Sequence, residues 1–306
     1  DTFVKIPLKT LNRHGLIAGA TGTGKTKSLQ VMAEQLSEKG IPSVLMDLKG
    51  DLSGLAQPGE MNSHIEKRHG GIGLDYNAKP MPVELMTIST EKGVKLRATV
   101  IEFGPVLISK ILGLNETQSG IMALVFKYCD DEKLALVDLK DLRKTLQYVS
   151  GDGKKAIEAE YGRISSASIS TIMRKIIELE QQGADLFFGE KSFNVNDFMR
   201  QDANGNGFIN IIRLIDIQQK PKLFSTFMLS LLAEIYTTFP EGGDGDKPKL
   251  CIFIDEAHLV FSQATKELLD QIEMIIKLSI PGPCSEAELD INGKSPHLTK
   301  HTMVIT

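Results

Sequence analysis

Short apolar runs alternate with longer amphipathic stretches along most of the chain, and this alternation predicts strands that take turns with helices. The first run covers residues 16–18 and is followed by an amphipathic stretch at 25–39, which Gly40 closes. A second buried strand is expected at residues 42–47. Further strands are expected at residues 83–89, 96–103, 208–214 and 250–254. The sequence therefore predicts an α/β fold with a mainly parallel sheet flanked by helices.

The middle of the chain has the period of helices. From residue 104 to about 189 the pattern is helical throughout, and one helix is expected to begin at Asp138. Another follows the Ser-rich run 165–170, and its apolar face contains Ile169, Ile172, Ile176 and Leu179. A helix that is apolar nearly all round is expected from Pro221 to about residue 236, so it should be buried.

A glycine-rich loop stands between the first strand and the first helix. It reads Gly19, Ala20, Thr21, Gly22, Thr23, Gly24, Lys25 and Thr26, which matches G-x-x-x-x-G-K-[ST], and these residues together with the following Lys27 are expected to bind the nucleotide. Glycines at this spacing let successive backbone N–H groups turn inward as an anion-binding nest at the start of a helix. Lys25 is expected to reach the β and γ phosphates, and the Thr26 hydroxyl to bind Mg²⁺. The loop therefore predicts a nucleoside triphosphate site.

Two acids follow the apolar run 250–254, where Asp255 and Glu256 are expected at the carboxyl edge of the sheet. Asp255 would hold the Mg²⁺ through a water, and Glu256 would take a proton from the attacking water. Glu256 and Lys25 are thus the catalytic candidates. Together the two motifs indicate an ATPase that uses ATP and Mg²⁺ and keeps its catalytic glutamate beside the Walker B strand.

With these motifs in place, the chain divides into four expected parts. Residues 1–103 form the first part of the ATPase core, 104–205 a mainly helical insert, 206–279 the second part of the core, and 280–306 a C-terminal tail. Residues 58–82 are rich in Gly, Pro, Asn and His and are expected to form a long surface excursion. Residues 302–306 have the composition of a strand.

A charged stretch, residues 47–51, follows the second expected strand, and two interpretations of it stay open. Asp47 or Asp51 could be an auxiliary carboxylate near the nucleotide, or a relay to a partner subunit. Alternatively the stretch is a turn in which Gly50 supplies a positive φ angle and the charged side chains face water.

Three other motifs predict only ordinary structure. Residues 202–207 resemble the opening of a calcium loop, but Arg213 stands where a bidentate Glu should close it, so a turn before a strand is expected. His297 and His301 have the spacing of a helical metal pair without a recognisable third ligand, so they are expected to be surface histidines. His258 completes the letters D-E-A-H of one helicase class, whose further motifs are not found.

Composition narrows the class of protein. The formal net charge of −4 gives no global basic field, so a contact with nucleic acid must come from a local patch or a ring lumen. The cysteines Cys129, Cys251 and Cys284 are odd in number and far apart, which fits a reducing cytoplasm better than a disulfide framework. No apolar stretch is long enough to span a membrane and no signal-peptide pattern begins the chain, so a cytoplasmic protein without a membrane partner is expected.

Four stretches together resemble the HerA-like ATPases of the HerA/FtsK superfamily, most closely the bacterial YjgR-type branch. They are LNRHGLIA at 11–18, DLKGDLSG at 47–54, GRISS at 162–166 and IFIDEAH at 252–258. The resemblance covers about residues 10–279. It implies a RecA-like P-loop core, a ring-shaped homo-oligomer with six subunits, and ATP-driven movement of a polymer, typically double-stranded DNA.

By motif match, the resemblance carries the phosphate and Mg²⁺ contacts to Lys25 and Thr26, the Walker B acid to Asp255 and the catalytic base to Glu256. A neighbouring subunit of such rings supplies an arginine to the γ-phosphate. The candidates, among which the sequence does not select, are Arg97, Arg143, Arg163 and Arg174.

The chain departs from the family pattern after residue 278. A further core strand ending in a polar Gln or Asn sensor is expected there, whereas this chain continues into the Pro- and Gly-containing run 279–284. Three functions follow as alternatives: a ring-forming DNA-linked motor, an ATPase that remodels a protein partner gripped by the helical block, and a nucleotide-dependent scaffold with little turnover.

Overall fold

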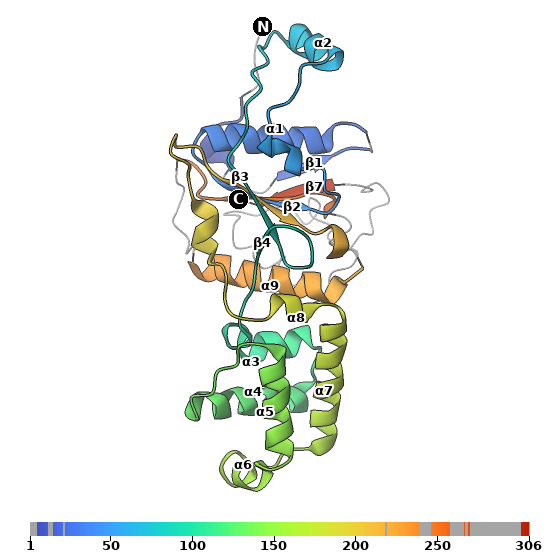
Figure 1. The fold of residues 1–306 in the computed structure, drawn as a ribbon, viewed down its shortest axis with the longest axis vertical. Helices are drawn as coiled ribbons and strands as arrows, with labels where there is room; N and C mark the ends of the chain where they lie inside the picture. Colours follow the sequence, from blue (N-terminus) through green and yellow to red (C-terminus); the bar gives the residue numbers. More distant parts are fainter. Residues whose placement is uncertain are drawn as a thin grey trace, which may run out of the picture.

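The computed structural model describes residues 5–11, 15–20, 22–217, 219–238, 246–257, 266, 269 and 301–305. Figure 1 shows an elongated molecule in which an α/β body lies between a helical block and a short projecting arm. Helix α1 (Lys25–Glu38) covers one face of the sheet, and helix α9 (Pro221–Thr238) covers the other.

The strands of the described residues form one sheet in the order β1-β7-β6-β2-β5-β3-β4. Their bounds are β1 Gly15–Ala18, β2 Ser43–Asp47, β3 Val83–Thr87, β4 Val94–Lys95, β5 Ile209–Arg213, β6 Cys251–Ile254 and β7 His301–Ile305. Neighbours from β6 to β4 pair in parallel, whereas β7 is antiparallel to both β1 and β6. Strand β1 therefore runs in the same direction as β6, and both strands end at the same edge of the sheet.

The central strands are apolar on both faces because both faces are covered. Leu45 of β2 packs in a cluster with Leu29 and Leu36 of α1, while Val44 and Met46 belong to a second cluster on the opposite face. That second cluster includes residues of α9 such as Phe227, which is fully buried. The α/β fold with a mainly parallel sheet flanked by helices is therefore confirmed.

A block of helices follows β4 and lies below the sheet in Figure 1. It contains α3 Val100–Ile111, α4 Glu116–Asp131, α5 Leu139–Ser150, α6 Lys154–Tyr161, α7 Ser166–Gln181 and α8 Ala184–Phe187. The apolar stripe expected on α7 is the buried face of that helix. Asp138 caps α5, as predicted, by accepting hydrogen bonds from the N–H groups of Lys140 (2.8 Å) and Asp141 (2.9 Å).

The expected strand at residues 96–103 is wrong, because α3 begins inside it at Val100. The Thr99 hydroxyl accepts a hydrogen bond from the Glu102 N–H at 3.3 Å, and the Glu102 carboxylate accepts one from the Thr99 N–H at 3.0 Å. This capping box satisfies two backbone donors at the helix start. A local polar signal therefore starts a helix where the apolar residues alone suggested a strand.

The arm is the excursion expected at residues 58–82, and it contains helix α2 (Ser63–Ile72). None of the α2 residues is buried. The side chain of Asn62 caps the helix, and Gly73 ends it in the left-handed conformation. Capping interactions at the two ends of α2, and no buried side chain of α2, thus define the helix of the arm, which projects from the body. Short 3₁₀ helices complete the described elements: η1 Leu8–Leu11, η2 Ser53–Ala56, η3 Val195–Met199 and η4 Ile215–Ile217.

The calcium-like motif is a turn before β5, as predicted. Asp202 accepts hydrogen bonds through Oδ1 from the N–H groups of Asn204 and Asn206, each at 2.8 Å, and through Oδ2 from the Asn206 side chain at 3.0 Å. These bonds lower the pKa of Asp202. Its oxygens face the N–H donors of the turn, and Arg213 lies at the end of β5.

Several expectations fall on residues outside the described ranges, namely those for Thr21, His258, Cys284 and His297 and for the run 279–284. The expected tail strand is present as β7. Among the residues that the structure describes, no helix is long and apolar enough to cross a bilayer.

Candidate nucleotide site

The glycine-rich loop connects β1 to α1 and depends on its glycines for two different reasons. Gly22 and Gly24 have φ angles of 80° and 93°, in the left-handed region that side chains with a Cβ resist. A Cβ at Gly19 would instead lie 2.5 Å from the Thr23 hydroxyl, so that position is restricted by space. Gly24 precedes α1 without a side-chain cap, so the first N–H groups of the helix face the loop.

The Ala20 carbonyl gathers the polar groups of the loop. It accepts hydrogen bonds from the Thr23 hydroxyl at 2.8 Å and from the Lys25 ammonium at 3.0 Å. Lys25 is buried, with only 9% of its surface exposed, so this carbonyl compensates part of the cost of burying its charge. Lys27, in the first turn of the helix, donates to the Gln30 side chain at 2.8 Å.

The two sequence motifs meet at Thr26 and Asp255. The Thr26 hydroxyl donates to Oδ2 of Asp255 at 3.3 Å, and Asp255 is 2% exposed. Thr26 lies in the first turn of α1, and Asp255 directly follows β6. A hydroxyl and a carboxylate oxygen side by side are hard donors of the kind that Mg²⁺ prefers, so the residues present fit this metal.

Glu256 lies beside Asp255 in a backbone conformation that is rare for its residue type. Its φ angle is 49°, and its N–H donates to Oδ1 of Asp255 at 2.9 Å. The carboxylate is nearly buried and forms an ion pair with the ammonium of Lys49, which follows β2. The hydrogen bond to Glu256 raises the pKa of Lys49, so Lys49 stays positively charged across the neutral range.

Asp47 organises the turn that carries Lys49. Its Oδ1 accepts hydrogen bonds from the N–H groups of Lys49 (3.3 Å) and Gly50 (2.6 Å), and Gly50 has a φ angle of 84°. Burial raises the pKa of Asp47, and the N–H donors oppose that rise. Gly50 therefore has the positive φ angle of the turn interpretation, but the charges of the stretch do not all face water, because Asp47 is buried and Lys49 pairs with Glu256. Asp51 is joined to α1 through its carbonyl, which accepts from the Gln30 side chain at 3.1 Å.

Comparison with known proteins now identifies the family. The family model described as "Helicase HerA-like C-terminal" matches residues 1–280, which is most of the chain. The chain belongs to this HerA-like family. Taken with the phosphate loop, membership indicates an ATPase-type enzyme of the P-loop class.

A solved structure also resembles this HerA-like chain, namely VirB4 of Thermoanaerobacter pseudethanolicus. The two chains are 13% identical with a TM-score of 0.43, and the match covers 85% of this chain and 66% of VirB4. The chain thus spans just under two thirds of the length of that protein. No curated protein matches the HerA-like chain.

The candidate arginines of the HerA-like chain lie in or beside the helical block. Arg143 forms an ion pair with Glu180 of α7 at 2.8 Å, and Arg174 donates to Thr171 on the same helix at 2.9 Å. Arg97 lies against Gly189, and Arg163 lies in the connection between α6 and α7. The site residues 22–26 and 255–256 belong to the α/β body, whereas Arg143, Arg163 and Arg174 belong to the helical block.

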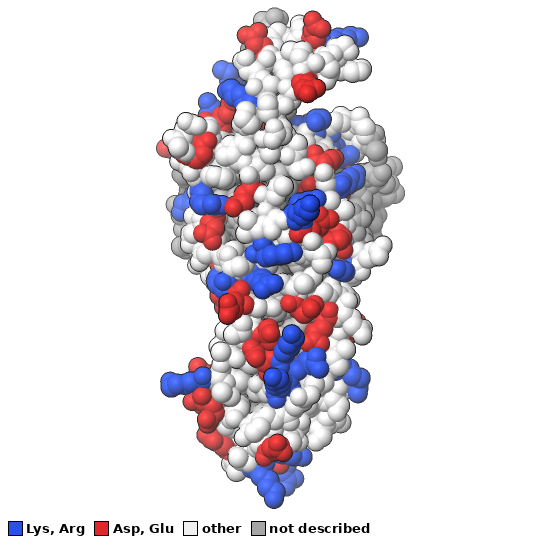
Figure 2. Space-filling model, in the orientation of Figure 1, with Lys and Arg blue, Asp and Glu red and all other residues white. Residues whose placement is uncertain are grey.

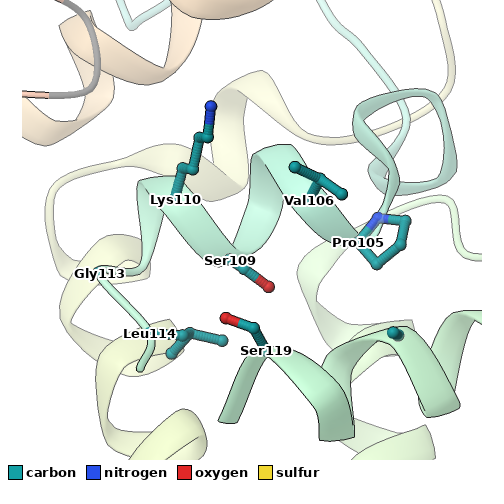
Figure 3. A pocket seen from close by; sticks show the side chains of 8 residues that line it. Pro105, Val106, Ser109, Lys110, Gly113, Leu114 and Ser119 are labelled. Atoms are coloured by element: carbon teal, nitrogen blue, oxygen red, sulfur yellow. The ribbon is translucent and has the colours of Figure 1, made fainter. Parts of the chain in front are cut away.

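The helical block of the HerA-like chain also contains a cavity of about 340 Å³ between α3 and α4. Figure 3 shows the hydroxyls of Ser109 and Ser119 pointing toward each other across it. The lining is mainly small and apolar, and Val106 at its rim is 69% exposed. This cavity is distant from the phosphate loop in the fold and offers no carboxylate to a metal.

Lys49, which pairs with Glu256, is not among the site residues expected from the sequence of the HerA-like chain. Its charge is part of a run that also fits a solvated turn, and only the pairing of β2 with β6 brings it to Glu256. One sequence signal could have indicated Lys49. It is a basic residue shortly after β2, the strand that lies beside β6 and its two following acids.

Proposed function

We propose that this chain is an ATP-binding and ATP-hydrolysing motor subunit. The contact between the Thr26 hydroxyl and the Asp255 carboxylate carries the proposal, because it joins the helix after the phosphate loop to the acidic strand end. Membership of the HerA-like family supports the same conclusion. The YjgR-type branch is a finer prediction that rests on the four stretches at 11–18, 47–54, 162–166 and 252–258.

Each side chain has a proposed role in this reaction. The backbone of residues 19–24 would cradle the phosphates, with Lys25 neutralising the β and γ oxygens and Lys27 flanking them on α1. Thr26 and Asp255 would hold Mg²⁺, which when bound supplies charge neutralisation to the phosphate oxygens. Glu256 would accept the proton of the attacking water at its carboxylate, and Lys25 would stabilise the charge that develops during transfer.

The polymer that such a motor moves is proposed to be double-stranded DNA, threaded through a ring of six copies that each donate an arginine to the neighbouring site. Family membership supports this alternative. The net charge of −4, and the mixture of basic and acidic side chains on the face in Figure 2, favour local contacts over a broad basic surface.

Remodelling of a protein partner is the second candidate. The cavity between α3 and α4, with Val106 exposed at its rim, favours it, because exposed apolar side chains are typical of protein contacts. The two candidates differ in whether duplex DNA stimulates turnover.

ATP turnover, measured with and without duplex DNA, tests both the proposed hydrolysis and the proposed DNA substrate. The Glu256→Gln variant should lose about a hundredfold or more in turnover while it retains nucleotide binding. Glu66→Gln on the exposed helix α2 is the matched control and should behave like the unmodified chain. Unchanged turnover in Glu256→Gln would remove the catalytic assignment. Turnover indifferent to DNA would favour the protein partner, and the mass in solution with nucleotide tests the ring.

A further inference from the structure

We propose that Lys49 is a positioning residue that restrains Glu256 and thereby limits hydrolysis. This inference rests on the proposed function, because it concerns how Glu256 is made available as the base. An ammonium paired with a carboxylate stabilises its charged form and so weakens it as a base, and withdrawal of the ammonium restores its ability to accept a proton from water. The ion pair between Lys49 and Glu256 is therefore the resting arrangement of the base.

The sheet brings the two residues together. Strands β2 and β6 are parallel neighbours in which Met46 is opposite Ile254. Both strands end at the same edge of the sheet. Lys49 lies three positions after Met46, and Glu256 lies two positions after Ile254. The ion pair thus joins a turn that belongs to neither motif to the acid that follows β6.

The turn fixes the backbone of Lys49 but leaves its side chain able to move. Asp47 accepts hydrogen bonds from the N–H groups of Lys49 and Gly50, so the main chain at this point is anchored. The Lys49 side chain is 47% exposed, whereas that of Glu256 is 6% exposed. The ammonium can leave toward solvent by rotation of its flexible stem, without rearrangement of the turn.

The burial of Glu256 explains why a partner is useful in the resting arrangement. A nearly buried carboxylate is costly unless it is paired or accepts hydrogen bonds. Lys49 supplies a charge of the right sign from the solvent side. A restraint of this kind predicts that removal of the ammonium increases turnover, which neither loss of structure nor loss of a substrate contact would do.

Lys49→Met tests this in the full chain, with Lys49→Arg as the matched control. Because the interaction of a half-exposed cation with a carboxylate is modest, Lys49→Met should raise the kcat for ATP about threefold to fivefold. Its KM should stay within about twofold of the unmodified value, since the phosphate loop is unchanged. Lys49→Arg keeps the charge and should restore the unmodified kcat. Lys49→Gln serves as a second neutral variant if Lys49→Met does not fold, as judged by its thermal unfolding.

The outcomes separate this inference from the proposed function. A kcat that falls in folded Lys49→Met and Lys49→Gln would overturn the restraint and make Lys49 a supporting group. A KM that rises severalfold at constant kcat would make it a phosphate contact, and unchanged kinetics would remove it from the reaction. If Glu256→Gln retains full turnover in the same assay, the proposed function itself fails. If Glu256→Gln is inactive and Lys49→Met is not faster, only the restraint fails.

Discussion

The hydroxyl of Thr26 lies 3.3 Å from Oδ2 of Asp255, although 229 positions of sequence separate the two residues. Such a contact is produced only by the whole sheet, because one residue lies on the helix after β1 and the other at the end of β6. It places two oxygen donors beside the phosphate loop.

Substitution of Thr26 tests this pair. Thr26→Ala removes one oxygen donor and should reduce ATP turnover about tenfold to a hundredfold, the effect expected for a lost charge-assisted interaction. Thr26→Ser keeps the hydroxyl and should retain most of the turnover. Titration of turnover against MgCl₂ is the measurement, and the Ala variant should need more Mg²⁺. Equal Mg²⁺ dependence in both variants would contradict the role of Thr26.

Lys25 should matter for the nucleotide and little for the fold. Its ammonium rests on the Ala20 carbonyl at 3.0 Å, which is a local contact within the loop. Lys25→Met should therefore weaken ATP binding about tenfold to a hundredfold, because it removes the cation that is proposed to contact the phosphates. Calorimetric titration with a non-hydrolysable ATP analogue measures the affinity. The thermal unfolding midpoint of Lys25→Met without nucleotide should stay close to that of the unmodified chain.

The buried thiol of Cys251 should make the fold sensitive to alkali. Burial raises the pKa of Cys251 from 9.0 to about 12. A group whose folded pKa is raised contributes stability that is fully present below the unfolded pKa and is lost as the pH rises toward the folded one. Between about pH 9 and 12 this thiol should cost about 1.4 kcal/mol of unfolding free energy for each pH unit. Urea unfolding across this range measures it.

The matched control for the thiol is Cys251→Val, which keeps an apolar strand residue and cannot ionise. The difference in unfolding free energy between the two chains should change with pH only above about pH 9. The native thiol should also resist iodoacetamide at pH 8 and react after denaturation, as peptide mass mapping would detect. Rapid labelling of Cys251 in the native chain would contradict its burial.

Two glycines should respond to alanine in opposite directions. A Cβ at Gly207 would lie 2.3 Å from the backbone carbon of Ile41, so Gly207→Ala should destabilise the fold by about 1–3 kcal/mol. Gly120 lies inside α4 with nothing within 4 Å of an added Cβ, so Gly120→Ala should stabilise it by about 0.5–1 kcal/mol. Denaturant unfolding gives both values. A loss of stability in Gly120→Ala would contradict the open surroundings described for it.

Apart from β4 and the wrong strand at 96–103, the strands and the loop could be predicted because their signals are local. The glycines before Lys25 form one short stretch, and the acids after β6 form another. The residue types and spacing within each stretch indicate a turn after the first strand and a pair of carboxylates after β6. The functional roles of these residues stay predictions until kinetics tests them. The start of α3 was also a local signal, in Thr99 and Glu102, but the apolar residues around it matched a strand equally well.

The pairing of Lys49 with Glu256 could not be predicted in this way. It depends on β2 lying directly beside β6 in the sheet, and the order of strands follows from packing of the complete chain. The position of β7 has the same cause. Its composition suggested a strand, but nothing in residues 301–305 indicates that it enters the sheet between β1 and β6 in the antiparallel direction.

This insertion of β7 has a consequence for synthesis on the ribosome. The backbone of β1 is made early but finds its partner in β7 only after residues 301–305 have emerged. One edge of β6 has the same delay. During that interval both strands present unsatisfied N–H and C=O groups, which are templates for pairing with another chain. Nascent chains halted before residue 301 should therefore require a chaperone to stay unaggregated.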